Sequence, residues 1–363
     1  MTFTSDQIAH ILGFSSSDNL ELSRETTIAS LWAGYGNVKS LKVITPSNTI
    51  PLIVKRVKPK NIQDTSVSNM RKIQSYHNEA QFYRSLAPLL HSLTNEKKIQ
   101  CHVAKAYKIE DDDASFTFLL SDLSESFHCR SISGMQQNGQ AIDFLAAFHA
   151  AFYKYDIPKS MWRDGGYWHL KTRWDEWECI SEPIFKNSAK AIDEVMRQDT
   201  DFHTLVHGDF KEANILFGDS ACAVVDFQYA GLGYGAKDLV MWIVSSLDSR
   251  TLDQLGEEKI LRMYAKSLKQ NLITIGRLSC NEIEKFTCIH NITKQYELAI
   301  VDYVRFMCGW GFWGSNSDYA WNRAKDILRD TASCWTSFRD GMDVEGLSEQ
   351  DWTFAIYERY KRE

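Results

Sequence analysis

The sequence predicts an α+β protein of two lobes: a small N-terminal lobe with a five-stranded antiparallel sheet, and a larger, mainly helical C-terminal lobe. Three observations lead to this prediction. A chain of 363 residues is longer than most single domains. Runs rich in β-branched and aromatic residues gather in its first third. Apolar residues at helical spacing dominate the remainder. We therefore expect an N-terminal lobe over residues 1–122 and a C-terminal lobe over residues 123–363.

The expected strands of the first lobe follow a short amphipathic helix. "TIASLWAG", "NVKSLKVI" and "PLIVKRV" predict an antiparallel meander joined by the turn sequences "GYG" and "PSNT". "VAKAYKIE" and "SFTFLL" predict a hairpin around an acidic turn at Asp111, Asp112 and Asp113. Between these groups, "MRKIQSYHNEAQFYRSLAPLL" has helical spacing until Pro88 disturbs it. The lobe is thus expected to hold five strands and one main helix.

In the second lobe, segments such as "AIDFLAAFHAAF" and "TRWDEWECI" predict helices. The exception is a pair of short strands, "NILFGD" and "CAVVDFQ", in the middle of the chain. We find no internal repeat and no low-complexity segment.

Charge and composition narrow the possible partners. With 41 basic and 47 acidic side chains the net charge is −6, and no long basic run could follow a nucleic-acid backbone. No apolar run is long enough to cross a bilayer, and the N-terminus lacks the pattern of a signal peptide. The eight cysteines lack metal-site or redox spacing, so we expect reduced thiols. These features predict a cytoplasmic protein with no nucleic-acid partner and no membrane insertion.

The stretch "LVHGDFKEANILF" gathers polar residues that suit chemistry. His207, Gly208, Asp209 and Asn214 fit the pattern H-G-D-x-x-x-x-N, and Asp226 follows at the end of the apolar run "CAVVDF". Alone, Asp and Asn are common in turns and helix caps. Two strands flanking one loop would bring the three oxygen-bearing side chains to one mouth. Such oxygens are the ligands that Mg²⁺ prefers, with phosphates and water completing its shell.

A cation for phosphate groups is also present. Lys55 lies in the predicted strand "LIVKRV", and Glu79 lies on the helix that follows, as an ion pair for phosphoryl transfer requires. The turn "AGYGN" places Gly34 and Gly36 where backbone could cover phosphates, although it lacks the third glycine of a G-x-G-x-x-G motif and is also typical of a hairpin turn. All five charged or amide parts occur in an order that favours phosphoryl transfer: Lys55, Glu79, Asp209, Asn214 and Asp226.

"LVHGDFKEANILF", "VVDFQYAGLGYGAKDL" and "HNEAQFYRSLAP" together resemble motifs of the protein-kinase-like small-molecule phosphotransferases. This group includes aminoglycoside phosphotransferases, choline and ethanolamine kinases, and the ecdysteroid kinase-like family. The last is the most similar, because an acid followed by Phe and Gln stands where protein kinases have D-F-G. The resemblance covers about residues 20–340, its specific motifs lie in 205–239, and it implies a protein-kinase-like fold with ATP between the lobes.

By this resemblance, Asp209 is the catalytic base, and Asn214 and Asp226 bind Mg²⁺. Lys55 would contact the α- and β-phosphates of ATP, and Glu79 would orient Lys55.

The resemblance also implies supporting roles. Asp238 would anchor the catalytic loop, and backbone at Ser121 and Leu123 would face adenine. His207 is expected to prop the loop. Lys211 could steady the transferring phosphate or point to solvent.

The acceptor is expected to be a small molecule. The segment from Asp226 to Asp238 is short and no A-P-E triplet follows, so the peptide platform of a protein kinase is missing. Two aromatic-rich stretches, "MWRDGGYWHLKTRWDEW" and "YVRFMCGWGFWGSN", could wall the acceptor pocket or fill the helical core. Glycines in the second are expected to interrupt its helix. Four residues are our acceptor-pocket candidates: Trp310, Trp313, Asp302 and Trp242.

The sequence leaves the chemistry of the acceptor open, because aromatic walls could hold a cationic amine beside an acid such as Asp302 or Asp318. They would equally hold an aromatic or steroidal alcohol. The first hypothesis is an ATP- and Mg²⁺-dependent kinase acting on a small-molecule hydroxyl by direct in-line transfer. The alternatives are a choline or ethanolamine kinase, an aminoglycoside-type antibiotic phosphotransferase, and, in a different class, a pseudokinase that binds nucleotide without turnover.

Overall fold

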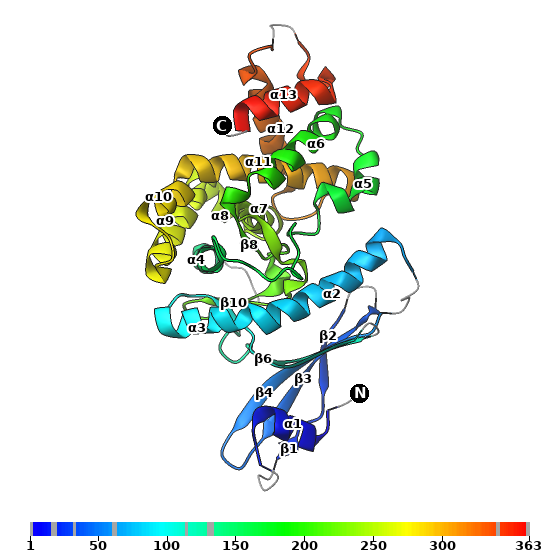
Figure 1. Cartoon of the computed structure of the whole chain (residues 1–363), viewed down its shortest axis with the longest axis vertical. Coiled ribbons are helices and arrows are strands. Elements are labelled where there is room, and N and C mark those ends of the chain that lie inside the picture. The colour runs from blue at the N-terminus through cyan, green and yellow to red at the C-terminus, as the bar shows by residue number, and fades with distance from the viewer. Residues whose placement is uncertain are drawn as a thin grey trace.

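A computed structural model describes residues 3–15, 20–31, 34–59, 64–112, 115–128, 134–338 and 342–360. Figure 1 shows an antiparallel sheet at one end of the molecule and a helical lobe at the other, with helix α2 (Val67–Ser85) running between them. The predicted α+β class with two lobes is confirmed. The sheet ends at Ser121, one residue before the boundary expected from the sequence.

The N-terminal sheet has six strands in the described residues, so the predicted number of five is wrong. The order is β1-β3-β4-β7-β6, with β2 also pairing with β3. All five predicted strands form, and the sixth, β1, is only two residues long, too short for an alternating pattern. The strands are β1 (Glu21–Leu22), β2 (Thr26–Ser30), β3 (Gly36–Ile44), β4 (Thr49–Val57), β6 (Ala106–Asp112) and β7 (Ser115–Ser121).

Alternation along β4 decides which side chains reach the space between the lobes. Leu52 and Val54 join a small core that includes Ile8 of helix α1 (Ser5–Leu12). Successive side chains of a strand point to opposite faces of the sheet. Ile53 and Lys55 therefore point the other way and line a cleft beside α2.

The first lobe holds a helix that the sequence did not predict. Pro88 does mark an interruption, but helix α3 (Ala87–Lys97) begins there rather than a loop. A proline in the first turn of a helix costs no hydrogen bond, because the first backbone N–H groups have no partner within the helix. The expectation of one main helix in this lobe is thus corrected to two, α2 and α3.

The C-terminal lobe is mainly helical, as predicted. The predicted pair β9 (Ile215–Phe217) and β10 (Cys222–Val224) is present, and β10 also pairs with β5 (His102–Val103). A second pair, β8 (His203–Val206) and β11 (Gly231–Tyr234), was not predicted. The helices are α4 (Met135–Phe152), α5 (Trp174–Glu178), α6 (Pro183–Gln198), α7 (Ala236–Ser245), α8 (Ser249–Leu255), α9 (Glu257–Ile275), α10 (Cys280–Thr287), α11 (Ile289–Trp310), α12 (Ser317–Cys334) and α13 (Glu349–Tyr360).

Asp113 of the predicted acidic turn and Cys129 lie outside the described residues. The other seven cysteines are free thiols. Within the described ranges, each helix is too short or too polar to span a lipid bilayer.

Candidate active site

A cleft of about 1040 Å³ lies between the N-terminal sheet and the helical lobe. This volume is at the upper end of the range for small-molecule sites. The cleft is lined by side chains of the N-terminal sheet, of α2, of the segment after β7 and of loops in the C-terminal lobe. Ten of the residues expected from the sequence line it: Lys55, Glu79, Ser121, Leu123, Asp209, Lys211, Asn214, Asp226, Trp310 and Trp313.

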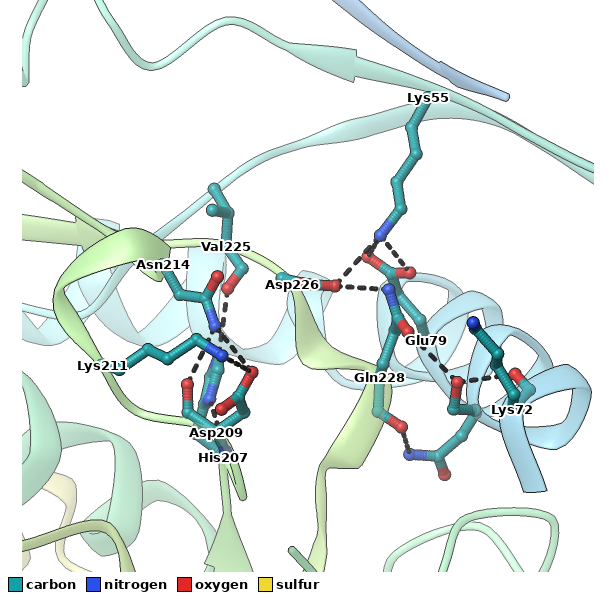
Figure 2. Close-up of polar contacts among 12 residues, drawn as sticks. Lys55, Lys72, Glu79, His207, Asp209, Lys211, Asn214, Val225, Asp226 and Gln228 are labelled. Atoms are coloured by element: carbon teal, nitrogen blue, oxygen red, sulfur yellow. Dashed lines mark hydrogen bonds and ion pairs between the residues drawn. The ribbon is translucent and has the colours of Figure 1, made fainter. Parts of the chain in front are cut away.

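The ammonium group of Lys55 joins the two lobes electrostatically. Its Nζ lies 2.9 and 2.7 Å from the two carboxylate oxygens of Glu79 on α2. It also lies 3.0 Å from Oδ1 of Asp226, which follows β10 of the C-terminal lobe. Figure 2 shows both carboxylates converging on this one nitrogen. The structure thus brings together three residues that lie far apart in the sequence.

This cluster contains one cation and two acids. Lys55 and Glu79 are buried, whereas the side chain of Asp226 is 35% exposed. Burial alone would lower the pKa of Lys55, but Asp226 and Glu79 raise it above its usual range. Burial raises the pKa of Glu79 to about 7, against the effect of Lys55. Burial would also raise the pKa of Asp226, but Lys55 more than offsets this and holds that pKa below its usual value. Asp226 is therefore the acid that stays ionised at neutral pH.

The backbone at Asp226 has an uncommon conformation that its neighbours stabilise. Its φ of 69° lies in the left-handed region, which few residues other than glycine adopt and which is found often at functional sites. The next ring, Phe227, is buried and stacks on Phe82 of α2 with the centroids 3.7 Å apart. Gln228 donates from Nε2 to Oδ1 of Asp226 at 2.7 Å and accepts from Ser75 on α2 at 3.1 Å. Helix α2 thus holds the turn that follows the carboxylate through both Phe227 and Gln228.

The loop after β8 carries the H-G-D-x-x-x-x-N motif. Asp209 is 6% exposed, and its Oδ2 lies 3.0 Å from Nζ of Lys211 and accepts from Nδ2 of Asn214 at 3.2 Å. Its other oxygen, Oδ1, has no hydrogen-bond partner among the described residues although it is buried. Burial raises the pKa of Asp209 to about 6, against the opposing charge of Lys211. An unpartnered acceptor of this kind, facing a cleft, is suited to bind a hydroxyl group.

His207 and Asp238 hold the backbone of this loop. Asp238, fully buried on α7, accepts hydrogen bonds from the N–H groups of His207 at 2.6 Å and Gly208 at 2.9 Å. The His207 ring lies 3.0 Å from the carbonyl oxygen of Val225, one residue before Asp226. Burial lowers the pKa of His207, so the ring is neutral and links the loop to the neighbouring strand. Through these contacts both side chains hold the loop backbone in place.

The oxygens left without protein partners fit a magnesium site. In the described part of the chain, Oδ2 of Asp226 and Oδ1 of Asn214 form no hydrogen bond, because Lys55, Gln228 and Asp209 contact the opposite atoms. Across all described residues, there is no cluster of three His, Cys, Asp or Glu side chains that could enclose a metal by themselves. One carboxylate and one amide, with phosphate and water oxygens, is the kind of shell that Mg²⁺ accepts.

The turn that contains Gly34 and Gly36 was expected to cover the phosphates, and the connecting segment after β7 (residues 121–124) was expected to face adenine. Gly34 has a φ of 65°, and Tyr35 anchors the turn by donating to Oδ1 of Asn69 on α2 at 2.5 Å. The neighbouring strand residues line the cleft, whereas Gly34 and Gly36 do not. Leu123 lines it, and within the described residues its backbone N–H has no hydrogen-bond partner. That N–H is thus free to donate to a ligand.

The acceptor-pocket candidates divide into two groups. Trp310 and Trp313 line the cleft, and Trp310 remains 47% exposed. The structure contradicts the other two assignments, since neither lines the cleft. Asp302 is buried in an ion pair with Arg305, 2.5 Å away, and Trp242 is fully buried and donates to Asn138 at 3.0 Å. Helix α11 also continues through the first glycine of the run and ends at Trp310, so only the later glycines interrupt it.

Several lining residues were not assigned from the sequence. Gln228 directly follows the D-F pair, and this position was the available signal. Arg173 lies in the first aromatic-rich stretch, where an arginine among aromatic residues was a signal that we did not use. Tyr167 of the same stretch was among the aromatic residues expected to wall the pocket, and it lines the cleft. Lys72 and Tyr229 also line the cleft, and their sequence context gave no signal.

Replacement of Gln228 by Ala is expected to weaken Mg-ATP binding about tenfold, the lower range for residues that orient metal ligands. The change removes the hydrogen bond to Asp226, so the carboxylate can rotate away from the orientation that leaves Oδ2 open. Calorimetric titration at several Mg²⁺ concentrations would measure the loss. Ser75→Ala is the matched control, since it removes only the bond to Gln228 and should have a smaller effect. Unchanged affinity in Gln228→Ala would contradict the orienting role.

Comparison with curated proteins finds none that matches the chain. The solved structures that are similar to the chain include the following three. The microcompartment-associated aminopropanol kinase is 14% identical with a TM-score of 0.45, covering 90% of this chain and 95% of that chain. The amicoumacin kinase hAmiN is 14% identical with a TM-score of 0.42, and the match covers 85% of this chain and 88% of that chain. A choline kinase from Cryptosporidium parvum Iowa II is 10% identical with a TM-score of 0.43, and the match covers 86% of this chain and 89% of that chain. Residues 38–164 and 165–277 match the family model described as ecdysteroid kinase-like, and because these segments make up more than half of the chain, it belongs to the ecdysteroid kinase-like family.

Proposed function

We propose that the chain is an ATP- and Mg²⁺-dependent kinase that transfers a phosphoryl group directly to a hydroxyl group of a small molecule. The observation that carries the proposal concerns Oδ1 of Asp209, which is buried and has no hydrogen-bond partner in the described part of the chain. It lies in the same cleft as the Lys55–Asp226 pair. A carboxylate with an open oxygen can orient a hydroxyl group and accept its proton. An ammonium across the cleft can bind phosphate oxygens.

Each residue then has a defined task. Bound Mg-ATP would supply the phosphoryl group and neutralise charge that develops during transfer. Lys55, held by Glu79, binds phosphate oxygens, while Asp226 and Asn214 hold the metal through their free oxygens. Asp209 aligns the acceptor hydroxyl with the phosphorus and takes up its proton.

The segment after Asp226 supports a small acceptor. It forms one 3₁₀ turn (Phe227–Tyr229), then β11, then α7, without a long intervening loop. Backbone pairing of β11 with β8 occupies this stretch. The segment is therefore too short to form a platform for a peptide substrate.

A mass-spectrometric screen tests this function. Amino alcohols, sterols and aminoglycosides are incubated with Mg-ATP, and products are examined for the mass gain of one phosphoryl group. Separate arms with choline, ethanolamine and aminoglycosides test the alternative kinases. Slow Mg²⁺-dependent ATP hydrolysis that disappears in Asp209→Asn would exclude a pseudokinase. Neither transfer nor hydrolysis under any condition would overturn the proposal.

The pH dependence of this hydrolysis is expected to follow Asp209. Its pKa is about 6, and the deprotonated form is the active base, so activity should fall as the pH drops below about 6. Lys211 opposes that rise in pKa. Lys211→Gln should therefore move the acid limb to higher pH by about one unit. Comparison with the unmodified protein cancels the titration of ATP, and Lys211→Arg should restore the original limb. Identical limbs in Lys211→Gln and the unmodified protein would contradict the assignment.

A further inference from the structure

The acceptor side of the cleft contains an aromatic cluster whose centre is already occupied by a cation. Arg173 and Trp310 both line the cleft. The Arg173 guanidinium carbon lies 4.9 Å from the ring centroid of Trp310, 5.5 Å from that of Phe306 and 5.8 Å from that of Tyr167. Rings arranged in this way could bind a ligand's ammonium group through cation–π contacts. Here the protein's own guanidinium makes those contacts.

Arg173 is fixed in place but keeps one donor free. Its Nε donates to the carbonyl oxygen of Tyr167 at 2.7 Å, and its Nη1 donates to Glu176 at 3.0 Å. Within the described residues, Nη2 has no partner. The side chain is 16% exposed, so this donor is held by rigid neighbours and still accessible from the cleft. A pre-organised guanidinium is well suited to bind a carboxylate or another oxygen acceptor.

A second arginine lies near Arg173 and adds to the positive charge of this part of the protein. Arg71 is buried, and burial together with the charge of Arg173 lowers the pKa of Arg71 to about 9. Glu176 and Asp164 offset part of this charge, but neither lines the cleft. Among the residues that the structure describes, the acids that do line it are Glu79, Asp122, Asp209 and Asp226.

These acids leave no carboxylate for a cationic acceptor. Glu79 and Asp226 contact Lys55, and Asp209 is the proposed base. Asp122 accepts from the backbone of Ser124 in the connecting segment. Asp302 and Asp318, which could have held an amine, do not line the cleft. A ligand cation would therefore meet Arg173 without a compensating acid.

We propose that the acceptor is a ring-containing alcohol without a cationic group, whose carboxylate or other hydrogen-bond-accepting oxygen binds Nη2 of Arg173 while a ring packs against Trp310. This inference rests on the proposed kinase function, and it assigns Arg173 as the residue that determines charge specificity. A positively charged Arg173 at this position would distinguish the site from one that binds quaternary ammonium compounds or polycationic sugars.

Three matched alcohols test the inference: para-(hydroxymethyl)benzoate, para-(hydroxymethyl)benzamide and para-(hydroxymethyl)-N,N,N-trimethylanilinium. They share one ring and one hydroxymethyl group and differ in charge. Ligand-observed NMR in the presence of Mg²⁺ and a non-hydrolysable ATP analogue measures their affinities. The anion should bind about tenfold or more tightly than the cation, with the neutral amide between them, since one tenfold step needs only a modest charge interaction.

Three variants locate the effect. Arg173→Gln should remove the preference for the anion, whereas Glu176→Gln should increase it by removing the competing carboxylate. Lys171→Gln is the matched control, because it removes one positive charge from the same segment at an exposed position that does not line the cleft. Opposite shifts in the first two variants cannot both result from a damaged fold.

Several outcomes would overturn the inference. These are equal binding of cation and anion, an unchanged ranking in Arg173→Gln, and no binding of any of the three alcohols. Because binding is measured without turnover, failure of the kinase proposal is distinguishable. In that case the charge preference persists, but no alcohol gains a phosphoryl group from Mg-ATP.

Discussion

Asp209→Asn is expected to lower phosphoryl transfer by about 10²-fold or more while leaving Mg-ATP affinity nearly unchanged. The substitution keeps the shape of the side chain and its contact with Asn214, but it removes the basic oxygen that would accept the hydroxyl proton. Metal and phosphate would still be held by Asp226 and Lys55. Turnover of the acceptor found in the screen, or background ATP hydrolysis, gives the rate, and calorimetry gives the affinity.

A matched control lies in the same loop. Glu212 is exposed, and Glu212→Gln makes the same change of charge three positions away from Asp209. That variant should retain the rate of the unmodified protein. Full activity in Asp209→Asn, or an equal loss in both variants, would show that the base has been assigned wrongly.

The sequence was informative where a single local pattern fixes the geometry. Alternation along "LIVKRV" places Lys55 on the inner face of the sheet, because a strand has a period of two. Asp209 and Asn214 lie in one loop, and β9 and β10 form the predicted pair beside it. The convergence of Lys55, Glu79 and Asp226 was predicted from their order in the chain, and the structure places them within hydrogen-bonding distance.

The remaining parts depend on contacts that a local pattern does not encode. Strand β1 is too short to show alternation, and the first turn of α3 contains a proline, Pro88, that was taken only as an interruption. Asp302 was a reasonable candidate for the acceptor pocket by residue type. Its ion pair with Arg305 could be recognised only once the structure showed which face of α11 is buried. Arg173 has aromatic neighbours in the sequence, but its contacts with Phe306 and Trp310 depend on how the distant helix α11 packs.

The loop that carries Asp209 also depends on one buried carboxylate, Asp238, that does not line the cleft. Asp238 accepts from the backbone N–H groups of His207 and Gly208, and Nε2 of His149 lies 3.1 Å from its Oδ2. Burial would raise the pKa of Asp238, but His149, His207 and the N–H of Gly208 together outweigh burial and hold that pKa below its usual value. A lowered pKa means that this carboxylate stabilises the fold above its unfolded-state pKa. That contribution is lost as the pH falls through the lower, folded-state value.

Asp238→Ala is expected to lower the free energy of unfolding by about 3–5 kcal/mol, the usual cost of removing one partner from a buried ionic network. Two backbone N–H groups beside Asp209 would lose their acceptor, so activity should fall as well. The loop is closely packed at Gly208, since a Cβ added there would lie 2.2 Å from the carbonyl oxygen of Tyr229. The backbone at Gly208 therefore has little room to move when its acceptor is removed. Urea titration followed by tryptophan fluorescence measures the stability. Asp253→Ala, at an exposed position of α8, should change it by no more than about 0.5 kcal/mol. A similarly small change in Asp238→Ala would mean that the loop holds its shape without this anchor.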